Sequence, residues 1–267
     1  MNPASSERWI RFLRVLFLLS LLTIVPSRGT GAEPPAVAVI DVMLLWTDSF
    51  QYLRDDTLWD QSEDLLNAAN QVFLNSQARV QLRLVHSGKV VVSPAVAYST
   101  RLLWERLAGT GDGTLDEVHA LRDRVGADLV LLSMGDANRV DWDAPRVLEA
   151  SQGFGVLISP EPVELARMIG HMLGCSGPNA PWEVLKEVAQ PGIFPDSHGL
   201  LLTNRPGVAT VMGRPDRLPV FSNPNLIAYR QALGIPGQAD NVRTLDTRAP
   251  EVAAFRGGPG IVRPPLI

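Results

Sequence analysis

The fold is decided by the stretch Val37-Ala38-Val39-Ile40-Asp41-Val42-Met43-Leu44-Leu45-Trp46, which the polar residues Thr47-Asp48-Ser49 follow. The stretch is apolar apart from Asp41 and is rich in β-branched residues. A continuous apolar run of this length and type is typical of a strand that is buried in a sheet. We therefore begin from a buried strand at 37–46 and ask what the flanking sequence builds around it.

Helices and further strands are expected to alternate after this strand. The predicted helices span 58–77, 100–108 and 115–125, and the predicted strands span 80–85, 127–133 and 153–158. Thr114 is expected to cap the third helix, because Glu117 follows it at the spacing of a capping box. Strands that alternate with helices predict an α/β sheet domain over about 37–175.

The pattern changes at about residue 176. Residues 176–250 are rich in Pro, Gly and Asn and contain only short apolar segments, with a brief helix expected over 184–189. Residues 251–267 are expected to be a flexible tail. The sequence thus predicts a domain over 33–250, whose upper part is the sheet and whose lower part is an irregular C-terminal subdomain.

Residues 1–32 are predicted to be a signal peptide. Arg8, Arg11 and Arg14 precede an apolar run over 15–26, and small residues up to Ala32 fit a cleavage site. The run is shorter than the roughly 20 residues that span a bilayer, although an uncleaved anchor remains an alternative. We expect an exported protein, periplasmic or secreted, that has no membrane contact after cleavage.

The charge and the cysteine content limit which partners and which disulfide bonds the protein can have. The formal net charge is −4, and residues 1–32 carry a positive balance, so the remainder is more acidic. An acidic body without a basic stripe excludes nucleic acid as an expected partner. Cys175 is the sole cysteine, so no intrachain disulfide forms; its thiol is expected to be buried, or else to bond between chains.

The stretch 161–177 contains part of a pattern that is typical of zinc sites. Ser159 and Pro160 mark a helix start, and Gly174 marks its end. His171 and Gly174 match two positions, the second His and the Gly, of the zinc motif H-E-x-x-H-x-x-G-x-x-H, in which two His four residues apart share one helix face.

Over about 37–248 the chain resembles the bacterial reprolysin-like zinc metallopeptidases, the adamalysin type of the metzincin clan. The resemblance rests on Ile40-Asp41-Val42-Met43 with Trp46-Thr47-Asp48, Asn67-Ala68-Ala69-Asn70-Gln71, Leu82-Arg83-Leu84-Val85-His86, Asp116 to Asp123 with Gly126 to Val130, His198-Gly199, Ala209-Thr210-Val211-Met212, Phe221-Ser222-Asn223-Pro224 and Asp240 to Leu245. It implies a metzincin-like α/β fold with a mixed, mostly parallel sheet packed with helices. It also implies that Met212 belongs to a Met-turn beneath the zinc position, although Met212 and Met172 are more simply explained as core fillers.

The resemblance places other residues where the family's zinc site has its functional groups. With His171 as the second His, Arg167 stands at the first His, Met168 at the general base and Gly177 at the third His. A guanidinium stays protonated and cannot bind zinc, and a thioether cannot move a proton. We therefore predict no catalytic residue and no metal ligand set, with His171 as the only surviving ligand position.

Other residues of a suitable type could bind zinc in place of the missing histidines. The candidates are Cys175, Asp196, His198 and Glu164. Glu164 lies about 10 Å from His171 along the helix axis, too far for one ion, and is expected to pair with Arg167 at i, i+3.

Three functions remain open at this point. The first is an inactive peptidase homologue that binds an unidentified peptide or protein in a cleft lined by Arg167 and His171. The second is an active zinc endopeptidase with a rearranged metal site, which would need zinc as cofactor. The third is an exported structural or interaction protein.

Overall fold

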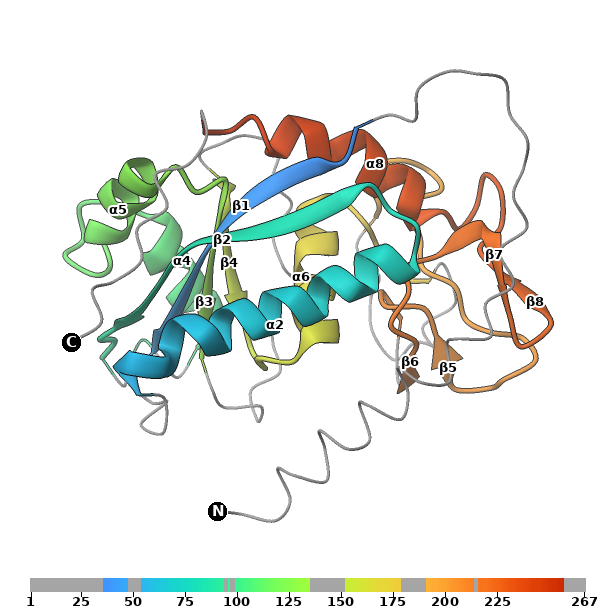
Figure 1. The fold of residues 1–267 in the computed structure, drawn as a ribbon, viewed down its shortest axis with the longest axis horizontal. Helices are drawn as coiled ribbons and strands as arrows, with labels where there is room; N and C mark the ends of the chain where they lie inside the picture. Colours follow the sequence, from blue (N-terminus) through green and yellow to red (C-terminus); the bar gives the residue numbers. More distant parts are fainter. Residues whose placement is uncertain are drawn as a thin grey trace, which may run out of the picture.

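A four-stranded parallel sheet forms the centre of the protein (Figure 1). The computed structural model describes residues 36–47, 54–93, 96, 99–134, 152–178, 191–213 and 216–256. The strands run in the order β2-β1-β3-β4, with bounds β1 Ala38–Thr47, β2 Val80–Val90, β3 Leu129–Ser133 and β4 Phe154–Leu157, and all their pairings are parallel. The apolar stretch 37–46 is thus an inner strand, as its composition predicts.

Both faces of the sheet are covered by helices, which explains why β1 and β3 are apolar on both sides. On β1, Ile40, Val42 and Leu44 pack into one core cluster, whereas Met43 and Leu45 pack into the other. The first face carries helices α2 (Asp55–Asn75), α6 (Pro162–Met172) and α8 (Asn241–Val252), and the second carries α4 (Thr100–Ala108) and α5 (Glu117–Val125). The predicted α/β fold with a mostly parallel sheet is confirmed.

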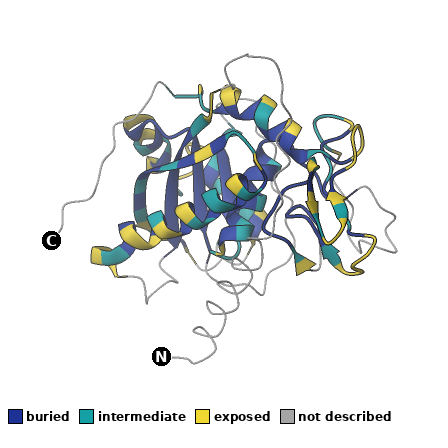
Figure 2. Cartoon of the chain, turned by 45° about the vertical axis from the view of Figure 1, so that its right-hand side comes forward, coloured by how far each residue is buried: buried dark blue, intermediate teal, exposed yellow. Residues whose placement is uncertain are grey.

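The C-terminal subdomain is built from short strands and has a small core of its own. β5 (Val208–Ala209) pairs with β6 (Asp216–Arg217), and β7 (Asn223–Ala228) forms a hairpin with β8 (Gln231–Leu233). Their core consists of Leu202, Leu218, Val220, Leu226 and Leu233. Figure 2 shows more exposed residues here than on the strands of the central sheet.

The closing helix departs from the expected division of the chain. α8 ends at Val252, and its residues Leu245 and Ala249 pack into the same core as β1 and α2. By packing it belongs to the sheet, so the boundary drawn at residue 250 cuts through this helix, and packed residues continue to Phe255. The expected signal peptide, the brief helix over 184–189 and residues 257–267 lie outside the described residues.

The predicted helix cap at Thr114 is wrong. α5 begins at Glu117, and Leu115 before it is buried in a left-handed conformation with φ of 62°. Burying a leucine is worth about 1.5–3 kcal/mol, whereas a capping hydrogen bond is worth about 1 kcal/mol. Burial of Leu115 therefore decides the local backbone, and Asp116 instead accepts hydrogen bonds from the Gly111 and Gly113 N–H groups.

Buried charges hold together the N-terminal ends of the strands. Asp41 receives a two-pronged ion pair from Arg83 at 2.6 and 2.9 Å. The Asp128 carboxylate accepts the backbone N–H groups of Asp41 and Arg256, at 2.9 and 3.0 Å. Desolvation by burial nevertheless raises the pKa of Asp128 to about 6.

This raised pKa predicts how stability depends on pH. Because folded Asp128 holds its proton more tightly than the unfolded chain does, its contribution to stability is full below about pH 4 and is lost as pH rises through 6. Asp128→Asn cannot ionise. We expect the unfolding free energy of the wild type, measured in urea, to fall relative to this variant between pH 4 and 7.5. A difference that stays constant across this range would contradict the assignment.

Of the helices in the described part of the chain, none combines the length and hydropathy that a bilayer-spanning segment needs.

Candidate functional site

Helix α6 begins two residues after the predicted start at Ser159 and Pro160, and it ends before Gly174 as predicted. It begins at Pro162, whose missing N–H costs nothing at the first helical position, and Gly174 follows its last turn with φ of 95°. In this conformation the Cys175 N–H donates to the Gly170 carbonyl at 2.9 Å and closes the helix. The helix also follows β4 directly, which sets its position beside that strand.

The two faces of α6 have different environments. Leu165, Met168 and Ile169 are buried in the core beneath the helix. The opposite face carries Glu164, Arg167 and His171, which are half-buried. Spacings of three and four residues place these three polar side chains in one row.

The guanidinium of Arg167 is hydrogen-bonded to the imidazole of His171. Arg167 Nη1 is 2.9 Å from His171 Nε2. Because a guanidinium can only donate, Nε2 accepts, and the neutral ring carries its proton on Nδ1. Zinc would need the same Nε2 lone pair at about 2.0–2.1 Å, so this contact and a metal bond through Nε2 exclude each other.

Glu164 joins Arg167 to the C-terminal subdomain. Its carboxylate accepts from Arg167 Nε at 2.8 Å, which confirms the ion pair predicted from the i, i+3 spacing. The other carboxylate oxygen pairs with Arg217 of β6, whose Nε donates to the Gly213 carbonyl at 2.7 Å. Burial lowers the pKa of Arg217. The side chains of Arg167 and Arg217 are each 14% exposed, so the row is largely shielded from solvent.

Arg217 is a site residue that the sequence did not reveal. It stands far along the chain from α6, in a short strand, and no motif includes it. Only the tertiary structure brings it to Glu164, through the ion pair between the two side chains.

Met212 lies close to both Gly170 of α6 and Gly177. A Cβ added to Gly170 would come within 2.9 Å of Met212 Sδ, and a Cβ added to Gly177 would come within 3.2 Å of the Met212 carbonyl oxygen. Met212 is 3% exposed and belongs to the main core. The segment that contains Met212 therefore packs against the helix that bears His171 and against Gly177.

Met168, at the general-base position, points away from the polar row. It is 2% exposed and packs in the main core with Met172, as core fillers do. An apolar side chain fits this buried place, and Met168 has no group that could accept a proton.

The other candidate ligands are engaged in structural contacts. Cys175 is buried in the main core, where desolvation raises the pKa of its thiol far above the usual range. His198 Nδ1 lies 2.9 Å from the Gly177 carbonyl oxygen, and Glu164 is held by its two arginines. The burial expected for Cys175 is confirmed, and its depth disfavours a bond between chains.

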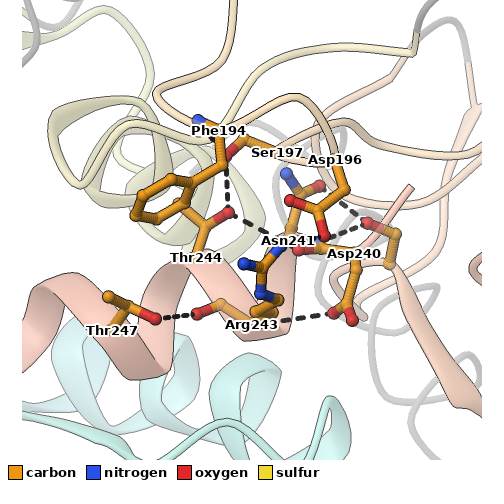
Figure 3. A network of polar contacts seen from close by, with 9 residues as sticks. Phe194, Asp196, Ser197, Asp240, Asn241, Arg243, Thr244 and Thr247 are labelled. Carbon is orange, nitrogen blue, oxygen red and sulfur yellow. Dashed lines mark hydrogen bonds and ion pairs between the residues drawn. The ribbon is translucent and has the colours of Figure 1, made fainter. Parts of the chain in front are cut away.

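Asp196 belongs to a polar network around the start of α8 (Figure 3). Its carboxylate pairs with Arg243, and its carbonyl accepts from the Asp240 N–H at 2.7 Å. Ser197 and Thr244 share a hydrogen bond of 2.6 Å within the same network. Asp196 thus fastens α8 to the segment 191–199. Across the ranges that the structure describes, no three His, Cys, Asp or Glu side chains gather as metal ligands would.

Comparison with known proteins relates the chain distantly to metallopeptidases. It is 25% identical over 201 residues to the peptidyl-Asp metalloendopeptidase of Stenotrophomonas maltophilia (strain R551-3), and the match covers 70% of this chain and 46% of that protein. The chain thus spans less than half the length of this relative. No family model matches.

Solved structures show a shared fold. The described architecture is similar to part of the structure of a chaperone-substrate complex, with a TM-score of 0.62, 19% identity, and coverage of 83% of this chain and 35% of that one. Metalloproteinase-II from Bacteroides fragilis aligns with a TM-score of only 0.32 at 15% identity, over 62% of this chain and 52% of that one. The first similarity supports the fold and nothing more specific.

Proposed function

We propose that the protein is an exported, catalytically inactive homologue of the reprolysin-like metallopeptidases, which binds a peptide segment without cutting it. Three parts make up the proposal: loss of the metal, retention of a peptide-binding surface, and export through residues 1–32. Each part has its own support.

The main support for the loss of the metal is one contact, the hydrogen bond from Arg167 to His171 Nε2. A guanidinium at this place supplies a positive charge without a vacant coordination position. Glu164 balances that charge, and Arg217 holds Glu164 in place. The donor set does not fit zinc, because it offers one imidazole nitrogen that already accepts a hydrogen bond.

Peptide binding is supported by the neighbourhood of α6. β4 is one of the two outer strands of the described sheet, with β2 at the other edge, and the chain passes from β4 into the helix that bears Arg167 and His171. An extended peptide can add to such a strand through main-chain hydrogen bonds, and this binding needs no metal. The peptidyl-Asp specificity in the name of the bacterial relative favours peptides that contain Asp as the first ligands to test.

The metal part is tested on the purified protein after chelator treatment and dialysis against zinc. We expect no stoichiometric zinc by elemental analysis, and no cleavage of an unstructured Asp-containing peptide. The metalloendopeptidase of Stenotrophomonas maltophilia, treated alongside, serves as the positive control. One tightly held zinc per chain, or cleavage that a chelator abolishes, would refute this part.

The binding part is tested by fluorescence titration with the same Asp-containing peptide. We expect saturable binding that weakens when Arg167 and His171 are both replaced by Ala. Arg124→Ala, an exposed change on α5, is the matched control. Absence of saturable binding would instead favour an exported structural protein.

A further inference from the structure

The β7–β8 hairpin turns through two residues that both adopt an unfavourable backbone conformation. Ala228 pairs with Gln231, which leaves Tyr229 and Arg230 as the turn. Their φ angles are 52° and 62°. Asn and Gly adopt positive φ readily at both turn positions, whereas for residues with larger side chains this conformation costs free energy. Tyr and Arg are thus kept here against the local conformational preference.

Side chains from a second loop hold the turn in this form. The Arg205 guanidinium lies over the Tyr229 ring, 4.1 Å from its centroid. Asn204 Nδ2 donates to the Tyr229 carbonyl, and the Asn204 N–H donates to Gln231 Oε1 at 3.1 Å. The tip is therefore organised before any ligand arrives, which reduces the entropy that binding would cost.

One face of the hairpin is apolar and exposed. Leu226 and Leu233 point inward to the small core of the subdomain. On the outer face Ile227 is 54% exposed and Tyr229 is 41% exposed, and Ala232, paired with Ile227, is also exposed. Figure 2 shows exposed residues along this hairpin and the adjoining loops. Tyrosine and arginine beside apolar surface are the residues that most often dominate binding energy at interfaces.

The charge of this region is opposite to that of the whole protein. Asp216 is the one acidic residue among the described positions 199–213 and 216–239, whereas Arg205 and Arg230 are exposed at and beside the hairpin tip. The complete chain has a formal net charge of −4. A second copy docked face to face would set these arginines against their equivalents, so charge disfavours self-association through this surface.

We infer that the outer face of the hairpin, formed by Arg205, Ile227, Tyr229, Arg230 and Ala232, is a docking surface for an acidic polypeptide segment of another protein. The two guanidinium groups receive its carboxylates, while Ile227 and Tyr229 contact an apolar side chain of the same segment. This hairpin-tip surface lies in the C-terminal subdomain and does not use Arg167 or His171.

The test measures fluorescence anisotropy of a labelled peptide of alternating Asp and Leu, titrated with the full chain. We expect saturable binding that weakens with salt. The double variant Arg205→Gln/Arg230→Gln should bind about tenfold more weakly or worse, as truncated hot spots do. Arg101→Gln/Arg124→Gln removes the same charge from exposed positions on α4 and α5 and should bind like the wild type.

A second variant separates binding from folding. Tyr229→Asn/Arg230→Gly suits the turn conformation better, so we expect a higher unfolding temperature together with lost binding. If this variant binds unchanged, or if the control loses as much affinity as Arg205→Gln/Arg230→Gln, the inference is wrong.

Three further outcomes would also overturn the inference. The first is a peptide titration that fails to saturate up to about 1 mM, a concentration at which only weak association remains. The second is binding to anionic lipid vesicles that is as tight as binding to the peptide, and the third is self-association through the hairpin in sedimentation. In an Arg167→Ala/His171→Ala background, which removes the binding proposed at α6, Arg205→Gln/Arg230→Gln should still weaken binding of the peptide, so failure here is distinguishable from failure of the proposed function.

Discussion

Arg167→His, Met168→Glu and Gly177→His, introduced together, are expected to give a chain that binds one zinc ion, whereas we expect none on the wild type. The triple variant removes the guanidinium from His171 Nε2 and supplies two more imidazoles and a carboxylate in the family's register. Three imidazole nitrogens with a fourth position left for water form a ligand set that catalytic zinc sites use. The measurement is elemental analysis after dialysis, with calorimetry for the affinity.

The surroundings of Arg167 and Gly177 can accommodate the two new imidazoles, whereas Met168→Glu places a carboxyl group among buried core residues and adds no zinc ligand. Glu164 would still pair with Arg217 after Arg167 is replaced, so no buried carboxylate loses its last cation. A side chain at position 177 begins 3.2 Å from the Met212 carbonyl oxygen, so that turn must yield by a few tenths of an ångström. The control is Arg167→Ala, which frees His171 but leaves one ligand and should bind no zinc. A folded triple variant that stays metal-free would show that the motif alignment is in the wrong register.

Arg122→Ala is expected to cause the largest loss of stability, about 3–5 kcal/mol, because it combines a cavity with orphaned backbone carbonyls. The Arg122 side chain is 1% exposed although it extends from helix α5. Its Nε donates to the Ala127 carbonyl at 3.0 Å, and its Nη2 donates to the Asp128 carbonyl at 2.5 Å. The guanidinium also lies 4.7 Å from the ring centroid of Phe154. Desolvation lowers its pKa to about 10, so it remains charged at neutral pH.

Urea denaturation measures this loss, with Arg124→Ala as the matched control. Arg124 lies on the same helix but is exposed, so its replacement should change stability by less than about 0.5 kcal/mol. Arg122→Met keeps much of the packing volume and should fall between the two. Equal midpoints for Arg122→Ala and Arg124→Ala would show that the buried guanidinium contributes nothing to the fold.

Interactions within one element could be predicted from the sequence. The apolar run 37–46 indicates a buried strand, and β1 is one. The spacing of Glu164, Arg167 and His171 places them on one helix face, and their contacts follow from that spacing. In these cases the relevant neighbours are three or four positions apart, so helical or strand geometry alone brings them together.

Tertiary packing decided the rest. It paired Arg217 with Glu164 and brought Met212 against Gly170. It also packed α8 against the sheet and buried Arg122, although arginine side chains are mostly exposed in folded proteins. Leu115 shows the same competition on a small scale, since burial of its side chain displaced the expected cap. Contacts between residues far apart in the chain depend on how whole elements pack, and local propensities of about 1 kcal/mol yield to that packing.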